Sequence, residues 1–98
     1  MPFKDKVLGV DEYTDSIVVT GQCDILIYGL TSGTIKLQFK LQPSTELPSP
    51  DWWDFPNGTF SADAFQTVFV SGDGVKCRLL GVDNNAGVYV RIAKFLNT

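Results

Sequence analysis

The sequence predicts an all-β fold, namely an antiparallel β-sandwich of immunoglobulin-like or jelly-roll-like type with seven or eight strands. In residues 33–41, apolar side chains occupy every odd position from Ile35 to Leu41 and polar side chains occupy the even positions. This period of two is typical of a strand with one buried face. Similar runs recur at intervals of about ten residues with turn residues between them, and no run has helical spacing. Residues 1–98 are therefore expected to form a single domain.

The strands of the first half can be placed in order. Residues 1–10 mix apolar and charged side chains and are expected either as an arm or as a first strand. Residues 16–20 are rich in β-branched side chains, which favour a strand. Residues 23–30 form the next predicted strand, and because both of its faces are largely apolar, we expect it to be covered on two sides or to lie at an interface. The glycine-containing turn at 31–33 predicts a hairpin with the strand 33–41.

The second half begins with a segment that is incompatible with central sheet. Residues 43–50 contain three prolines, which fix φ and lack a backbone donor, so we expect a loop or an edge crossing between sheets. The sequence Pro-Asn-Gly at 56–58 is a strong turn signal. Residues 65–71 and 75–82 are predicted strands with a Gly-Asp-Gly turn between them, and residues 87–95 form the last predicted strand.

Composition narrows the classes of partner. With 44% hydrophobic and 19% charged residues, the 98-residue chain falls in the globular class, and no apolar run approaches the roughly 20 residues that a membrane-spanning helix needs. The first residues contain no apolar signal region, so we expect a soluble protein that folds in a cytoplasm. A net charge of −3 opposes binding to a phosphate backbone. Nucleic acid and membrane insertion are therefore not expected.

The residues argue against catalysis. The chain contains no histidine, which removes the commonest general base and the commonest metal ligand in proteins. Two cysteines are too few for a structural zinc site, and no glycine-rich nucleotide motif is present. Asp51 and Asp54 are the most suggestive carboxylate pair for glycoside hydrolysis, but a chain this short leaves little room for a catalytic cleft. We therefore expect no enzymatic activity, no cofactor and no metal.

Cys23 and Cys77 each lie inside an apolar strand pattern. A bridge between two facing sheets is one interpretation, as in immunoglobulin domains. Reduced, buried thiols are the other, and this interpretation is favoured because a cytoplasm keeps thiols reduced and free cysteine behaves as a small hydrophobe.

The segment 51–55 supplies the candidate binding residues. In an extended segment, neighbouring side chains point to opposite faces, so Trp52 and Trp53 cannot share one pocket. Three interpretations remain open: both indoles cap an open end of the sandwich, they form a subunit or partner interface, or one of them is a platform on which a sugar stacks. The candidate residues, for an interface or for a sugar platform, are Trp52, Trp53, Phe55, Asp51 and Asp54.

The polar face of the strand 33–41 carries Thr34, Lys36, Gln38 and Lys40. A charged outer face usually meets only water, and lysines on a sheet also discourage aggregation between sheets. No site is assigned to this face.

The order of these runs resembles that of a group of short phage proteins with small β-sandwich folds. The resemblance rests on a strand ending in glycine, a Gly-Thr-apolar-x-Leu-Gln strand, a tryptophan, a Gly-x-Phe turn, an Arg-Leu strand and a closing apolar strand. The matching residues of this chain are 21–29, 33–38, 53, 58–60, 76–79 and 88–92. The chain departs from the pattern in its proline-rich segment 43–50 and in its doubled tryptophan.

The resemblance implies a bacteriophage virion component that is made in the host cytoplasm: a capsid decoration or cement protein, or part of a head or tail fibre. The implied partners are other virion proteins and further copies of the chain, because a small domain with a limited core gains stability from oligomerisation. The alternative is a carbohydrate-binding module, or a receptor-binding fibre domain, that holds a host-surface glycan on an exposed tryptophan.

Overall fold

The computed structural model describes residues 3–40 and 52–94, and within these residues it contains only strands, turns and loops. All strand pairs are antiparallel, and the strands form one sheet in the order β1-β6-β2-β5-β3-β4. The predicted all-β antiparallel fold is confirmed. No helix in the described residues is long and apolar enough to cross a membrane. The strands are β1 (Phe3–Leu8), β2 (Ile17–Tyr28), β3 (Thr34–Lys40), β4 (Trp52–Phe60), β5 (Ala64–Val82) and β6 (Val88–Lys94).

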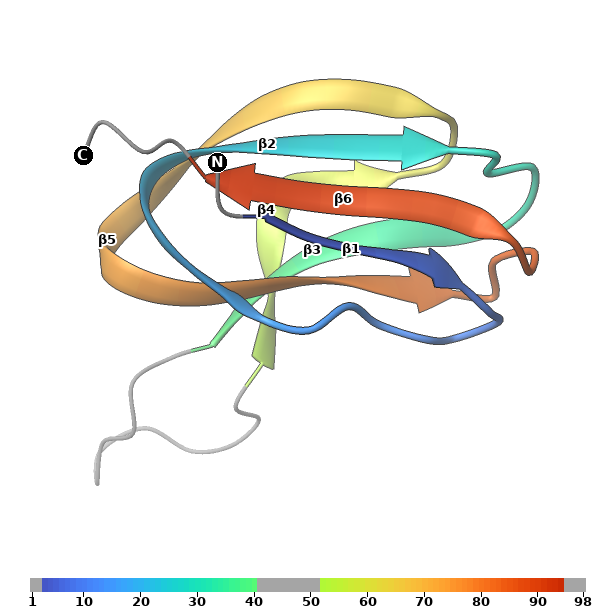
Figure 1. Ribbon diagram of the computed structural model, residues 1–98, viewed down its shortest axis with the longest axis horizontal. Helices are drawn as coiled ribbons and strands as arrows, with labels where there is room; N and C mark the ends of the chain where they lie inside the picture. The colour runs from blue at the N-terminus through green and yellow to red at the C-terminus, as the bar shows by residue number, and fades with distance from the viewer. Residues whose placement is uncertain (1–2, 41–51, 95–98) are drawn as a thin grey trace.

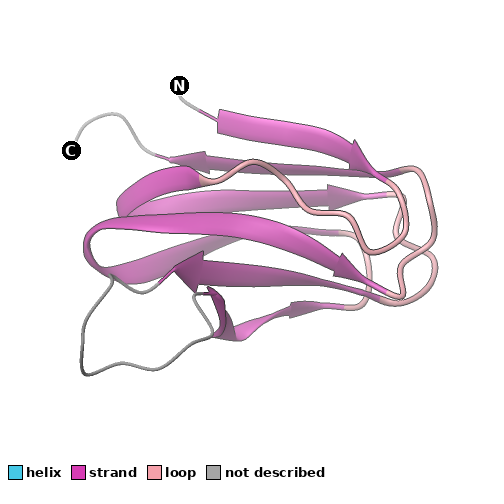
Figure 2. Ribbon diagram, turned by 90° about the horizontal axis from the view of Figure 1, so that it is seen from below, coloured by secondary structure: helices cyan, strands magenta, loops and turns pink. Residues whose placement is uncertain are grey.

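The single sheet folds over on itself and makes two layers (Figures 1 and 2). The first layer contains β1, β6, the C-terminal part of β2 and the N-terminal part of β5. The second layer contains the start of β2, the C-terminal part of β5, β3 and β4. The two long strands, β2 with 12 residues and β5 with 19, pass from one layer to the other. Residues 3–8 therefore belong to the fold as an edge strand.

Two of the predicted turns are bends inside continuous strands. Gly21 in β2 and Gly74 in β5 have φ of 82° and 70°, and the register of the β2–β5 pair shifts between Val19 and Gly21. Glycine adopts this left-handed conformation without steric cost, so the chain can turn between layers while the ladder resumes beyond the bend. The described residues consequently form six strands, because each of these two long strands accounts for two of the predicted runs.

The Pro-Asn-Gly signal at 56–58 is a bulge within β4. Lys36 pairs with Thr59 while Gln38 pairs with Asp54, so extra residues of β4 loop out of the ladder. Asn57 has a φ of 60°, which asparagine tolerates better than most residues. The turn residues thus bend an edge strand without ending it.

The predicted hairpin between β2 and β3 is wrong, because β3 pairs with β4 and β5. The connection between β2 and β3 carries the chain from the first layer to the second. Its backbone is held by side chains from other loops: the carboxylate of Asp63 accepts a hydrogen bond from the Leu30 N–H at 2.7 Å. A side chain at Gly33 would collide with the backbone of Asp83, so only glycine fits there.

The loops that join β1 to β2, β2 to β3 and β5 to β6 gather at one end of the molecule (Figure 2). Two asparagine side chains tie them together. Asn84 accepts a hydrogen bond from the Asp11 N–H at 2.9 Å and donates to the Gly9 carbonyl at 3.1 Å. Asn85 accepts from the Thr31 N–H at 2.8 Å. This end of the sandwich is therefore closed by amide groups whose hydrogen bonds are satisfied.

The core lies between the two layers and draws on every strand. Its members are aliphatic side chains, the two cysteines and Phe60 of β4. Burying one such aliphatic side chain contributes about 1.5–3 kcal/mol. Cys23 and Cys77 are both buried and free, as favoured from the sequence. The fully buried core residues are Leu8, Val19, Cys23, Ile25, Ile35, Leu37, Cys77, Leu79, Val88, Val90 and Ile92.

Candidate functional site

The two tryptophans lie on opposite faces of the edge strand β4. Trp52 pairs with Lys40 and Trp53 pairs with Phe39, so the extended segment directs successive side chains to different sides. Trp53 and Phe55 share the side that faces the core, and Trp52 shares the outer side with Asp54. The interpretation in which both indoles cap one open end is therefore wrong. Asp51 lies outside the described residues.

On the core side, Phe55 packs against the core. Its ring meets that of Phe39 edge to face, with centroids 6.0 Å apart and an interplanar angle of 85°, which is a favourable aromatic geometry. The indole of Trp53 lies at the margin of the layer and is 40% exposed. Phe55 is thus chiefly a packing residue, whereas the indole of Trp53 is partly exposed.

On the outer side, Trp52 belongs to a stack centred on Arg78 of β5. The guanidinium carbon of Arg78 lies 4.3 Å from the ring centroid of Trp52 and 4.3 Å from that of Tyr13. The Nζ atom of Lys40 lies 6.0 Å from the Trp52 centroid. A cation over an aromatic face at these distances is attracted by the ring quadrupole. Arg78 therefore holds together the loop before β2 and the edge strand β4.

Hydrogen bonds extend the stack across three strands. The Nε of Arg78 donates to Oε1 of Gln38 at 3.0 Å, and Nε2 of Gln38 donates to Oδ1 of Asp54 at 3.0 Å. Lys36 extends this series of interactions with an ion pair, in which its Nζ lies 3.2 Å from Oδ2 of Asp54. The bond from Gln38 and the nearby Lys36 charge lower the pKa of Asp54 below 3.8 against an opposing desolvation, so this carboxyl is ionised at neutral pH.

Tyr13 is held over Arg78 by its neighbour in the chain. The buried hydroxyl of Thr14 accepts a hydrogen bond from the Leu79 N–H at 3.0 Å, and the Thr14 N–H donates to the Leu79 carbonyl at 2.9 Å. Tyr13 forms an isolated bridge with Leu80. We call this outer surface of the second layer the arginine face, with the members Tyr13, Lys36, Gln38, Lys40, Trp52, Asp54, Lys76 and Arg78.

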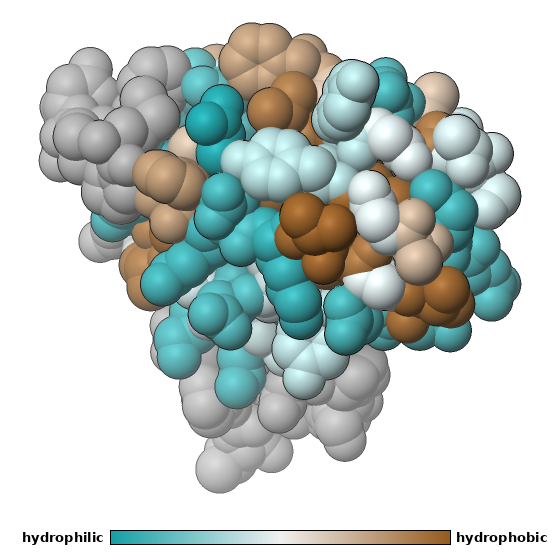
Figure 3. All heavy atoms as spheres, turned by 45° about the vertical axis from the view of Figure 1, so that its right-hand side comes forward, coloured by the Kyte–Doolittle hydropathy of each residue, from teal (hydrophilic) through white to brown (hydrophobic). Residues whose placement is uncertain are grey.

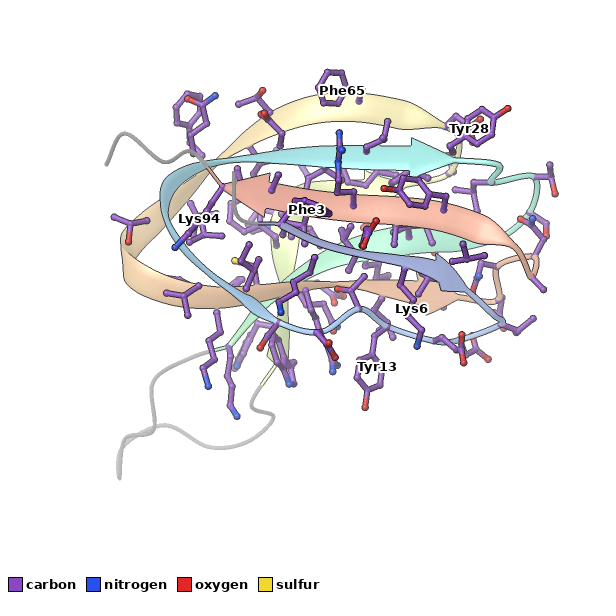
Figure 4. The ribbon with its side chains drawn as sticks, in the orientation of Figure 1. Phe3, Lys6, Tyr13, Tyr28, Phe65 and Lys94 are labelled. Carbon is purple, nitrogen blue, oxygen red and sulfur yellow. The ribbon has the colours of Figure 1, made fainter. Side chains whose placement is uncertain are left out.

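The first layer has a different outer surface, which we call the aromatic face. The ladder brings Leu26 of β2 beside Phe65 of β5 and Tyr28 beside Tyr89 of β6. Phe65, Phe69 and Tyr28 are 71%, 73% and 69% exposed. Phe65 and Tyr28 project away from the sheet, on the side of the molecule opposite Tyr13 (Figure 4). The members of the aromatic face are Phe3, Val7, Leu26, Tyr28, Phe65, Phe69 and Tyr89.

Polar groups are scattered over the aromatic face. The Tyr89 hydroxyl donates to Oδ2 of Asp5 at 3.0 Å, and the Thr67 hydroxyl donates to Oδ1 of Asp24 at 2.8 Å. Apolar side chains also reach the surface between polar ones on the side of the molecule drawn in Figure 3. The aromatic face thus combines uncovered rings with a few oriented carboxylates, as protein interfaces do.

Sequence reasoning found the tryptophan segment and missed the partners of Trp52. The signal for Arg78 was present, because its alternation with Cys77 and Leu79 places it on an outer face. Only the strand order shows that Arg78 and Trp52 lie on the same outer face, and the alternation does not give the strand order. The signal for Phe65 and Phe69 was also present, since in the strand 65–71 they alternate with the buried Val68 and Val70.

The described residues contain no group of three Cys, Asp or Glu side chains that could hold a metal ion. Burial raises the pKa of Cys23 to about 11 and that of Cys77 to about 12, so both thiols are protonated at neutral pH. A buried, protonated thiol is a poor nucleophile. The groups that the two outer faces expose are aromatic rings, cations and carboxylates.

Comparison with protein-family models, with curated proteins and with solved structures found no match to this chain.

Proposed function

We propose that this chain is a non-enzymatic structural protein of a bacteriophage virion, which associates with further copies of itself through the aromatic face. The observation that carries the proposal is the set of exposed rings on the first layer. The phage part rests on the resemblance of the strand and turn pattern to short virion proteins. A small domain that offers binding surface and contains no histidine suits the decoration or cementing of a capsid, or a place in a head or tail appendage.

Exposed rings of this kind are costly unless they are covered. Monomeric proteins scatter single apolar side chains over their surfaces, whereas contiguous apolar patches mark interaction sites. Here Phe65 and Leu26 are ladder neighbours, and Phe69 lies on the same outer face four pairs along, beyond the Asp24–Thr67 pair. Covering these rings removes apolar area from water at about 25 cal/mol per Å².

The charges of the aromatic face suit a second copy of the same surface. Arg91 of β6 pairs with Leu26 of β2, and the next outward residue of β2 is Asp24. Arg91 and Asp24 are therefore diagonal neighbours of opposite charge. In a symmetric dimer of this face, the two-fold axis lies in the interface plane, midway between Arg91 and Asp24. This axis brings Arg91 of each copy against Asp24 of the other, as a self-complementary interface requires.

The association is tested by sedimentation velocity over a wide concentration range. A variant that carries both Phe65→Lys and Phe69→Lys should lose self-association by about tenfold or more, since buried rings dominate interface energies. Val10→Lys is the control, because Val10 is exposed and lies in the loop that follows β1. The control should associate like the wild type.

A wild-type chain that stays monomeric at all concentrations, or a control that dissociates as much as the double variant, would contradict the proposed association. Electron microscopy of the particle that carries this chain tests the virion role. Density for repeated copies on the capsid or tail supports it, and absence of the chain from purified particles contradicts it.

A second candidate function is carbohydrate binding at Trp53, favoured by the 40% exposure of its indole on an edge strand. Trp52 does not offer an open platform, because Arg78 and Lys40 lie over its ring. Titration of neutral oligosaccharides while tryptophan fluorescence is followed should then give a saturable change that Trp53→Ala abolishes and Trp52→Ala retains. No saturable change would remove this candidate.

A further inference from the structure

The arginine face concentrates positive charge on an acidic protein. Lys36 and Lys40 of β3 and Lys76 and Arg78 of β5 all point outward, which is half of the eight Lys and Arg residues of a chain whose net charge is −3. In the described part of the chain, Asp54 is the one carboxylate that forms an ion pair with any of these four side chains. The face is therefore locally cationic.

The Arg78 guanidinium is held rigidly in this face. Two aromatic planes lie against it, each with its centroid 4.3 Å from the guanidinium carbon, and its Nε is engaged by Gln38. The terminal nitrogens carry four further N–H donors in a fixed planar fork. A fork fixed in advance loses little conformational entropy when it meets a carboxylate, which it binds through two parallel hydrogen bonds.

We propose that the arginine face binds an acidic, extended segment of a partner protein, with Arg78 as the bidentate carboxylate anchor and Lys40 and Lys76 as flanking cations. The strand geometry supports an extended segment. Lys76 and Arg78 are two residues apart on β5, which separates them by about 6.6–6.8 Å, and alternate side chains of an extended peptide have the same spacing. Lys40 lies directly opposite Lys76, so it doubles the charge at that step.

A peptide suits this face better than an acidic glycan does. A sugar ring needs an uncovered aromatic face on which to stack, and the Trp52 and Tyr13 rings each have the Arg78 guanidinium over one face. The arginine face instead presents hydrogen-bond donors and positively charged side chains, which the strands hold in place. This inference concerns the second layer and does not depend on the self-association proposed for the first.

The test uses the full chain and three probes of equal length: an oligoglutamate peptide, an oligoglutamine peptide and an oligogalacturonate. Binding is measured by titration calorimetry at low and high salt. The charge variant combines Lys40→Gln and Lys76→Gln, and its matched control combines Lys4→Gln and Lys94→Gln, which changes net charge equally away from the arginine face. Thermal melts establish that both variants fold.

We expect oligoglutamate to bind the wild type at low salt and weaken at high salt, and oligoglutamine not to bind. The charge variant should lose at least about tenfold in affinity and the control less than about twofold. Arg78→Lys, which keeps the charge and loses the fork, should also weaken binding. Equal losses in the charge variant and its control, equal binding of both peptides, or binding of oligogalacturonate without oligoglutamate would overturn the proposal.

Discussion

The outer faces of the two layers use aromatic side chains in opposite ways. On the arginine face, the rings of Trp52 and Tyr13 are occupied by the guanidinium of Arg78, which is itself tied to Gln38. On the aromatic face, Phe65 and its neighbours project into solvent (Figure 4). One face satisfies its rings within the chain, and the other leaves them for another molecule.

The difference shows that an aromatic residue in a strand does not by itself indicate a binding site. Trp52 was a natural candidate from the sequence, yet in the structure it stabilises the second layer from outside. Phe65 and Phe69, which are less conspicuous in the sequence, have the larger exposed fractions. What separates the two cases is the side chain that reaches the ring: Arg78 of β5 lies against Trp52, whereas the ladder partners of Phe65 and Phe69 are Leu26 and Gln22.

The largest expected effect on stability is therefore at Arg78. Arg78→Ala removes the cation from two rings and leaves the buried Gln38 side chain without its donor, which should lower the free energy of unfolding by about 2–3 kcal/mol. Phe65→Ala should change it by no more than about 0.5 kcal/mol, because the ring is already in water. Urea denaturation of the two variants measures both values. Equal destabilisation by the two substitutions would erase the distinction between the faces.

A sharper comparison uses the cation–π pair that each face contains. Arg78 lies 4.3 Å from the Trp52 centroid, and Arg91 lies 5.8 Å from that of Phe3. Double-mutant cycles should give a coupling energy of about 1 kcal/mol for the first pair and less than about 0.5 kcal/mol for the second, which is more distant and solvated. The reverse order would contradict the view that the arginine face is internally organised.

The smallest expected effect is on thermal stability at acid pH. The folded-state pKa of Asp54 lies below its ordinary value of 3.8, through the bond from Gln38 and the Lys36 charge. The resulting stabilisation is present above that ordinary value and is lost as the pH falls through the lowered folded-state pKa. Thermal melts of Asp54→Asn should accordingly differ from the wild type at neutral pH and converge with it at low pH. A difference that grows as the pH falls would contradict this assignment.

Much of the fold follows from the period-two alternation, including the buried and exposed sides of β3, β5 and β6. The strand ends were harder to predict. Gly21, Gly74 and the Asn57–Gly58 pair carry turn signals, but the backbone uses their left-handed or tight conformations to bend strands whose pairing resumes beyond them. Local sequence specifies that the chain turns, and only the long-range ladder decides whether the strand stops.

The candidate site was predicted in part. The alternation correctly separates Trp52 from Trp53, but the polar side chains of Lys36, Gln38 and Lys40 were expected to meet only water. Their role emerges from strand order, since β3 lies between the Arg78 part of β5 and the Asp54 part of β4. A sequence without known strand order does not show which outward residues become neighbours.

The association of copies through the aromatic face is tested most directly by following aromatic side-chain signals by NMR as the protein is diluted. If copies associate in this way, the signals of Tyr28, Phe65 and Phe69 shift with concentration and those of Tyr13 and Trp52 do not change. Shifts centred on Tyr13 and Trp52, or spectra that do not change with concentration, would contradict it.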